Sequence, residues 1–234
     1  MPTYPPTSES VNSESNPVTS SLVGPIPVPT YGPGGNFTII SKTRIPAAPA
    51  EVLSLVRDTN TWPTWNTFCP SCVIAPPTDP APTPTDPSIP SGNTNWLDLG
   101  THATIDVHMS GDGLVPGSKR SRTQGLCITH LEPIDKDGKK GYMIAWKGTG
   151  FSNWQLHSER VMEFVECQME DGDMGTSYVC WETFGGMLGS VVKATVGNQL
   201  IDRFGDYSRD LREYFMKMKG AKTGGSERDE IGEL

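Results

Sequence analysis

The chain has 234 residues and a formal net charge of -8, with 27 acidic against 19 basic residues. This acidity argues against nucleic acid or an anionic membrane as the main partner, because both attract basic surfaces. No stretch approaches the roughly 18 consecutive apolar residues of a membrane-spanning helix, so no integral membrane segment is expected.

The first 35 residues are rich in Pro, Ser, Thr and Gly and show no period of 2 or 3.6. Such a composition predicts a disordered N-terminal tail over residues 1–35. The N-terminus lacks the basic and apolar regions of a secretory signal, and the five cysteines are an odd number, which suits reduced thiols better than a disulfide framework. We therefore expect a cytoplasmic protein.

The first regular elements follow this tail. The segment 37–45 is β-branched and bounded by Gly and Pro, which predicts a strand. Pro49 suits the first turn of a short helix, and Thr61 can cap a second one with Pro63 in its first turn. The proline density of residues 75–95 excludes helix and sheet and indicates an insertion loop, which could close over a pocket.

Strands dominate the middle of the chain. Residues 99–109 alternate, with Ala103, Ile105, Val107 and Met109 on one face and His102, Thr104, Asp106 and His108 on the other. Because side chains alternate across a strand, the first face is expected to be buried and the second solvated. Further strands are predicted over residues 121–134, 141–148, 157–168 and 176–184, separated by Gly, Asp and Lys turns. The pattern indicates an antiparallel meander.

The last predicted element is also the longest. Between residues 187 and 218, apolar residues recur at spacings of three or four, and charged residues fill the opposite face. This pattern predicts one long amphipathic helix lying on a sheet. Residues 219–234 are polar and are expected to form a disordered C-terminal tail.

The order of strand, two short helices, meander and long terminal helix resembles the START-like superfamily, also known as Bet v 1-like or SRPBCC, which includes polyketide cyclases and lipid-transport proteins. Three local motifs carry the resemblance: Ile45–Val52 before the first helix, Asp58 with Trp62, Trp65, Asn66 and Phe68, and Glu182–Gly186 before the last helix. The resemblance implies an α+β helix-grip fold over residues 36–218: a curved antiparallel sheet of about six to seven strands around the terminal helix. It also implies a cavity for a hydrophobic ligand, although fold alone does not fix activity.

Two patterns that could hold a metal are better explained as structural. Cys69 and Cys72 have the spacing of a redox or zinc motif, but no second pair of ligands accompanies them. Asp106 and His108, with His102, share a strand face that we expect to be solvated. No nucleotide-binding loop or nucleophile elbow occurs. We therefore expect no metal and no cofactor.

The strongest chemical candidates are Arg160 and Glu182. Arg160 shares a strand face with Met162 and Phe164, and an arginine on an apolar face needs a partner, an opening or an anionic ligand. Glu182 is its obvious partner, although the sequence leaves open whether Glu182 or its neighbours Trp181 and Thr183 face the interior. If both groups face the cavity, they could act as a general acid and base.

The remaining candidates are apolar or aromatic side chains expected to contact a ligand. They are Met109, Tyr142, Trp146, Trp154, His157, Met162, Phe164, Tyr178, Leu188 and Val192. Two functions fit such a cavity. One is cofactor-independent cyclisation, dehydration or isomerisation of a polyketide- or terpenoid-like molecule, and the other is non-catalytic carriage of a lipid, quinone or similar metabolite. Ionisable groups that face the cavity favour the first.

Overall fold

The computed structural model describes residues 18–76, 86–89, 95–110 and 121–229, and the following elements lie within them. The strands are β1 (Thr19–Val23), β2 (Phe37–Ile45), β3 (Ser71–Ile74), β4 (His102–His108), β5 (Ser121–Lys136), β6 (Lys139–Thr149), β7 (His157–Gln168) and β8 (Met174–Gly185). The helices are α1 (Pro49–Arg57), a single 3₁₀ turn at Thr59–Thr61, α2 (Trp62–Trp65) and α3 (Gly189–Asp229).

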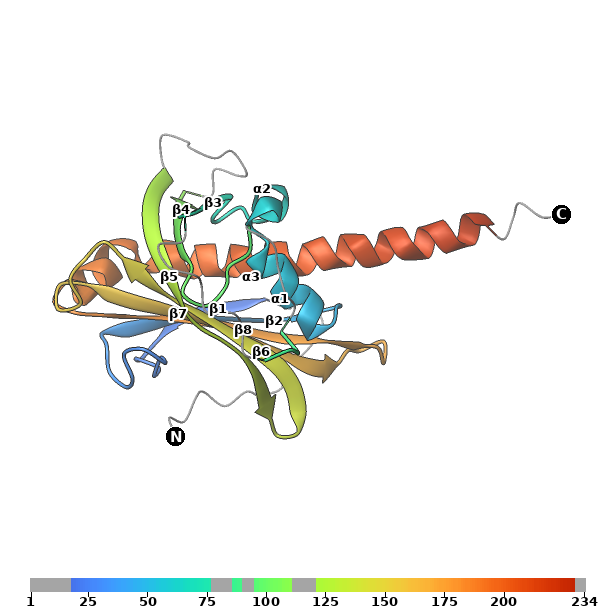
Figure 1. The fold of residues 1–234 in the computed structure, drawn as a ribbon, viewed down its shortest axis with the longest axis horizontal. Coiled ribbons are helices and arrows are strands. Elements are labelled where there is room, and N and C mark those ends of the chain that lie inside the picture. The colour runs from blue at the N-terminus through green and yellow to red at the C-terminus, as the bar shows by residue number, and fades with distance from the viewer. Residues whose placement is uncertain (1–17, 77–85, 90–94, 111–120, 230–234) are drawn as a thin grey trace.

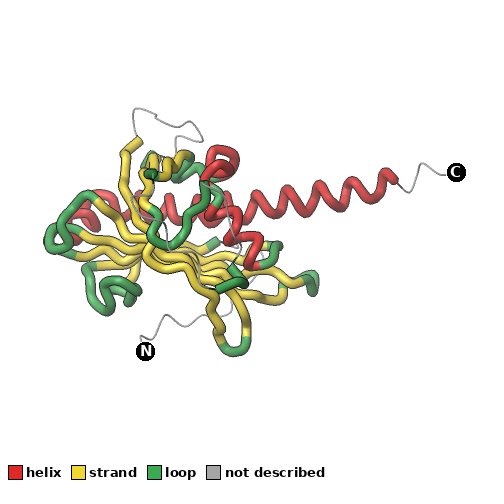
Figure 2. Tube along the Cα trace, viewed as in Figure 1, coloured by secondary structure: helices red, strands yellow, loops and turns green. Residues whose placement is uncertain are grey.

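All eight strands form one sheet in the order β1-β2-β8-β7-β6-β5-β4-β3, and every neighbouring pair is antiparallel. α3 crosses one face of this twisted sheet, with the two short helices α1 and α2 beside it (Figures 1 and 2). This arrangement confirms the expected helix-grip fold. The sheet has eight strands instead of six or seven because β1 and β3, both short, were not predicted.

The face of the sheet that carries α1 and α3, here called the inner face, holds the larger hydrophobic core. Phe204, Tyr207 and Leu211 of α3 are buried there against the strands. The hydroxyl oxygens of Ser41 on β2 and Ser208 on α3 lie 2.8 Å apart. This hydrogen bond helps to hold the helix on the sheet. The long amphipathic pattern therefore does what its periodicity predicts, which is to bury one stripe against strands.

The opposite, outer face of the sheet is covered by the N-terminal segment, which corrects the expected tail of residues 1–35. β1 pairs with β2, and residues 24–35 then run across β8 and β7. The indole Nε1 of Trp181 donates to the Pro27 carbonyl, the Thr183 hydroxyl donates to the Ile26 carbonyl, and Val28 is buried. Composition averaged over 35 residues hides this segment, because its order comes from side chains on a distant strand. Residues 1–17 lie outside the described residues.

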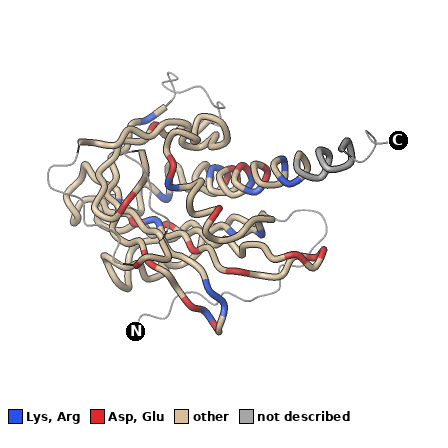
Figure 3. Tube along the Cα trace, turned by 45° about the vertical axis from the view of Figure 1, so that its right-hand side comes forward, with Lys and Arg blue, Asp and Glu red and all other residues tan. Residues whose placement is uncertain are grey.

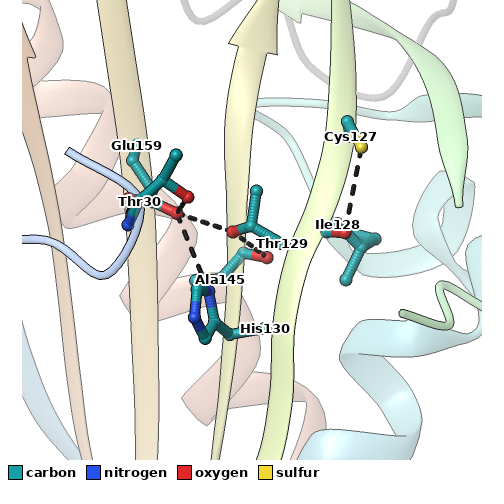
Figure 4. A network of polar contacts seen from close by, with 7 residues as sticks. All are labelled: Thr30, Cys127, Ile128, Thr129, His130, Ala145 and Glu159. Atoms are coloured by element: carbon teal, nitrogen blue, oxygen red, sulfur yellow. Dashed lines mark hydrogen bonds and ion pairs between the residues drawn. The ribbon is translucent and has the colours of Figure 1, made fainter. Parts of the chain in front are cut away.

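A fully buried carboxylate, Glu159 on β7, fastens this N-terminal segment to the sheet (Figure 4). Thr30 donates to it twice, from its backbone N–H at 2.7 Å and from its hydroxyl at 2.6 Å. The Thr129 hydroxyl on β5 donates at 2.6 Å, and His130 Nδ1 lies 4.0 Å away. Three donors replace the water that a buried carboxylate loses, so the burial is tolerated.

The C-terminal end also differs from expectation, because α3 continues to Asp229 where residues 219–234 were predicted to be a tail. α3 projects beyond the sheet (Figure 1), and charged residues gather along the part of the helix that is coloured by residue type and at hairpin turns (Figure 3). Lys219 Nζ bridges Asp171 and Asp173 in the β7–β8 turn at 2.8 and 2.7 Å. Once a helix is nucleated, each added residue gains a hydrogen bond at little cost, so polar residues can extend it.

Most of the proline-rich insertion of residues 75–95 lies outside the described residues. The prediction that it covers a pocket falls on the same residues. In its described part, the Ser88 carbonyl accepts a 3.0 Å hydrogen bond from the Tyr142 hydroxyl, and Ile89 is buried. Among the described helices, none is both long and apolar enough to cross a bilayer.

Candidate functional site

A cavity of about 410 Å³ lies between the inner face of the sheet and the first turns of α3. Its deep end is formed by buried residues, among them Phe68, Trp146 and Leu200. Its other end is marked by Phe151 and Val191, which line the cavity and yet are 56% and 54% exposed. The cavity therefore has a closed, aromatic interior and an opening where the β6–β7 connection meets the start of α3.

Arg160 and Glu182 both line this cavity. The register of β7 against β8 places them directly opposite each other, and Arg160 Nε donates to Glu182 Oε2 at 2.9 Å. Their side chains are only 6% and 13% exposed. The question that the sequence left open is thus answered: Glu182 lies on the inner face, whereas Trp181 and Thr183 lie under the N-terminal segment.

The guanidinium of Arg160 is also surrounded by aromatic rings. Its Cζ lies 4.3 Å from the ring centroid of Phe204, 5.3 Å from that of Phe68 and 5.7 Å from that of Trp146. Burial alone disfavours the charge, but the Glu182 carboxylate opposes burial most strongly, and the net pKa of Arg160 is raised above its usual value. Arg160 therefore stays cationic, held by one carboxylate and by ring faces.

Ten residues were predicted from the sequence to contact a ligand, and the structure divides them into two groups. Met109, Trp146, His157, Leu188 and Val192 line the cavity. Tyr142, Trp154, Met162, Phe164 and Tyr178 do not line it, so the structure brings only half of the predicted set together at this cavity.

The reason for the division is that two helices share the inner face. Met162, Phe164 and Tyr178 have the predicted facing, but they are fully buried in the core that α1 and α3 form with the sheet. Tyr142 is bonded to Ser88, and Trp154 is 65% exposed in the β6–β7 connection. Alternation along a strand gives the face of a residue but not which helix covers it.

Several lining residues were not predicted, including Phe68, Cys69, Gln124, Thr149 and Ser158. Ser158 continues the alternation of Arg160, so it was accessible to the same argument. Thr149 was not, because alternation from Trp146 assigns it to the other face and it lines the cavity from the very end of β6. Phe68 and Cys69 follow α2 in an irregular segment, where no periodicity indicates the direction of a side chain.

His157 stands beside the opening with a defined tautomer. Because the Asn153 carbonyl can only accept, the Nδ1–H of His157 donates to it at 2.6 Å. The neutral ring then carries its lone pair on Nε2. His157 can accept a hydrogen bond from a ligand group near the opening.

The prediction that Asp106 and His108 lie on a solvated face of their strand is wrong in part. His108 is fully buried, its backbone N–H donates to the Phe68 carbonyl, and its Nε2 lies 3.3 Å from Asp106 Oδ2. The segment after α2 packs over this end of β4, which the alternation of β4 alone does not show. His102, at the other end of the strand, is exposed as expected.

The thiols of the Cys69–Cys72 motif are protonated rather than reactive. Burial raises the pKa of each to about 12, and for Cys69 the charge of Arg160 offsets only part of this effect. The pKa of Cys180 is likewise raised by burial, to about 11. A neutral thiol is a poor nucleophile and a poor metal ligand, so these cysteines act as small apolar side chains here.

This yields a direct prediction. At pH 8, iodoacetamide should alkylate Cys69, Cys72 and Cys180 in the folded protein at least about a hundredfold more slowly than in guanidinium, because the thiolate fraction falls tenfold per pKa unit. Peptide mapping by mass spectrometry measures each rate, with the unfolded chain as the control. Rapid labelling of native Cys69 or Cys72 would contradict the assignment.

The geometry defines a class of protein: a helix-grip protein with a mostly apolar internal cavity and one buried ion pair in its wall. No family model matches the chain. The "Oxopyrrolidines biosynthesis cluster protein O" of Penicillium oxalicum is 32% identical over 167 residues, which cover 68% of this chain and 77% of the relative. The chain belongs to the same family as that protein.

Solved structures give more distant likenesses. A hypothetical protein from Helicobacter pylori has a TM-score of 0.48 and 13% identity, covering 87% of this chain and 90% of its own. A STAR-related lipid transfer protein from Xanthomonas axonopodis has a TM-score of 0.48 and 12% identity, covering 88% and 98%. The sheet order and the terminal helix themselves make this a START-like, Bet v 1-like fold, as the motifs indicated.

Proposed function

We propose that the cavity binds a hydrophobic, polyketide- or terpenoid-like molecule and promotes a cofactor-independent cyclisation, dehydration or isomerisation. One observation carries the proposal: Arg160 and Glu182 both lie in the wall of an otherwise largely apolar cavity. A chamber that only stores an apolar guest gains nothing from an ion pair, which costs desolvation.

The two side chains have complementary roles. Glu182 Oε2 accepts from Arg160 Nε, so the terminal NH₂ groups of the guanidinium remain to hold a carbonyl or enolate oxygen of the substrate. The second carboxylate oxygen of Glu182 is then the general base, which removes a proton beside that carbonyl and returns it elsewhere on the substrate. The aromatic walls exclude water and fold the chain of the substrate into a reactive shape.

The relative supports a biosynthetic setting. Its printed name places it in a biosynthesis cluster for oxopyrrolidines, compounds that carry the kind of polar carbonyl that Arg160 suits. We propose that this chain also acts in secondary metabolism. This proposal concerns the biosynthetic setting and not the identity of the substrate.

A carrier is the second candidate, and one observation favours it. Arg160 is enclosed by rings and neutralised by Glu182, an arrangement that also suits a purely structural pair. Under this alternative, the pair stabilises the wall while the cavity carries a lipid, a quinone or a similar metabolite unchanged.

Gene deletion and complementation distinguish the catalytic function from the carrier function. The deletion strain is complemented with the wild-type gene, with Glu182→Gln, or with the matched control Glu163→Gln, a buried glutamate on the outer side of β7. We expect an unaltered precursor to accumulate in the deletion and Glu182→Gln strains and its product to return with the control. Native mass spectrometry of each purified protein shows whether the precursor still binds. If Glu182→Gln restores full product formation, the catalytic proposal fails and the carrier remains.

A further inference from the structure

An apolar rim surrounds the opening of the cavity. It consists of Phe151 and Trp154 in the β6–β7 connection, Met187 just before α3, and Val191 in its first turn, which are 56%, 65%, 66% and 54% exposed. They are four of the eight large hydrophobic residues that are exposed in the described part of the chain. Single exposed apolar residues are ordinary, but a cluster of this kind marks an interaction site.

The backbone holds the rim together and connects it to the cavity. Met187 N–H donates to the Trp154 carbonyl at 3.0 Å, and Leu188 N–H donates to the Gln155 carbonyl at 2.9 Å, so the two connections form one ridge. Phe151 and Val191 belong both to the rim and to the cavity wall. Apolar side chains therefore extend from the outside of the protein into the wall of the cavity.

The charge near the rim differs from that of the whole chain. Segments 148–158 and 185–200, which carry the rim residues, contain Lys193 but no aspartate or glutamate, although the chain carries 27 acidic residues. Arg122, which is exposed, adds a cation to the cavity wall, where the carboxylate of Glu182 is already paired with Arg160. Around the opening, repulsion of phosphate groups is thus replaced by weak attraction, despite a net charge of -8.

We propose that the rim docks on a phospholipid membrane, so that the hydrophobic ligand passes between bilayer and cavity without crossing water. Trp, Phe and Met side chains flanked by basic residues are suited to the interface of a bilayer, where the rings and the thioether leave water and the cations face phosphates. The rim binds the membrane peripherally, through side chains and not through a spanning helix. This inference stands whether or not the ligand is transformed.

The test is flotation of the full-length protein with phosphatidylcholine vesicles, with and without 20 mol% phosphatidylserine. We expect binding to both, and the double variant Trp154→Ser/Met187→Ser should lower the partition coefficient about tenfold or more, from the lost apolar burial. The matched control is Met174→Ser, since Met174 is 61% exposed on the β7–β8 hairpin, away from the opening. All changes are at exposed positions, and equal thermal midpoints confirm equal folding.

The depth to which the rim inserts into the bilayer gives a second readout. Brominated phosphatidylcholine should quench part of the tryptophan fluorescence of the wild type, and Trp154→Phe should abolish that part while still floating. The proposal is overturned if the wild type binds neither vesicle, if Met174→Ser weakens binding as much as the rim variant, or if binding survives loss of the rim. Rim-dependent binding to a protein in vesicle-free extract, without lipid binding, would also overturn it.

Discussion

Replacing Glu182 by Leu is expected to lower the free energy of unfolding by about 3–5 kcal/mol, and Arg160→Met by a similar amount, because each leaves an unpaired charge in a dry wall. The double variant should recover most of this loss, since well-packed apolar side chains replace a buried ion pair at little cost. Urea denaturation of the four proteins completes a double-mutant cycle.

The matched control is an exposed ion pair on α3. Lys217 Nζ lies 3.9 Å from Glu213, with the two side chains 80% and 50% exposed. Lys217→Met should change stability by about 0.5 kcal/mol or less, since solvent screens such pairs. If Glu182→Leu were equally silent, the pair in the cavity wall would be solvated, and the argument for its chemistry would lose its basis.

Deletion of residues 1–35 is expected to reduce stability by about 5 kcal/mol or more. The deletion removes β1 and uncovers the outer cluster that includes Ile40, Val161 and Trp181, each large side chain contributing roughly 1.5–3 kcal/mol when buried. It also takes two of three donors from Glu159. Thermal unfolding and binding of the dye 1-anilinonaphthalene-8-sulfonate should report a loosened sheet.

A shorter deletion serves as the control. Removal of residues 2–17 leaves β1 and the segment that covers β8, so it should leave the midpoint of unfolding within about 2 °C of the full chain. Should the longer deletion not yield protein, Thr30→Val tests the same contact, with an expected loss of about 1–3 kcal/mol from the lost hydroxyl donor. Wild-type stability of both Thr30→Val and the long deletion would show that the segment is dispensable.

Local sequence patterns predicted most of the fold. Segments 37–45 and 157–168 match β2 and β7 at both ends, because β-branched residues and clear turn signals coincide there. The pairing of Arg160 with Glu182 followed from a simple cost argument: a guanidinium on an apolar face needs an acid. What local patterns could not supply was the facing of Glu182, which the hairpin register fixes.

The failures share a physical cause, which is that the stabilising partner lies far away in the sequence. Residues 24–35 are rich in proline and glycine, and become ordered only because Trp181, Thr183 and Glu159 offer them partners. In the same way, Met162 and Phe164 were correctly placed on the inner face, but α1 covers them in place of a ligand. Tertiary contacts override composition in both cases.

The central pairing of β2 with β8 has a consequence for how the protein is made. Thr38 and Thr183, whose hydroxyls are 2.7 Å apart, are separated by 145 residues, and Ser20 contacts Ile201 across 181. At roughly 5–20 residues per second, a ribosome needs on the order of ten seconds to supply the second partner. Throughout that interval the edge of β2 that pairs with β8 is unsatisfied, although β1 is already available for the other edge, so we expect slow folding and dependence on chaperones during synthesis.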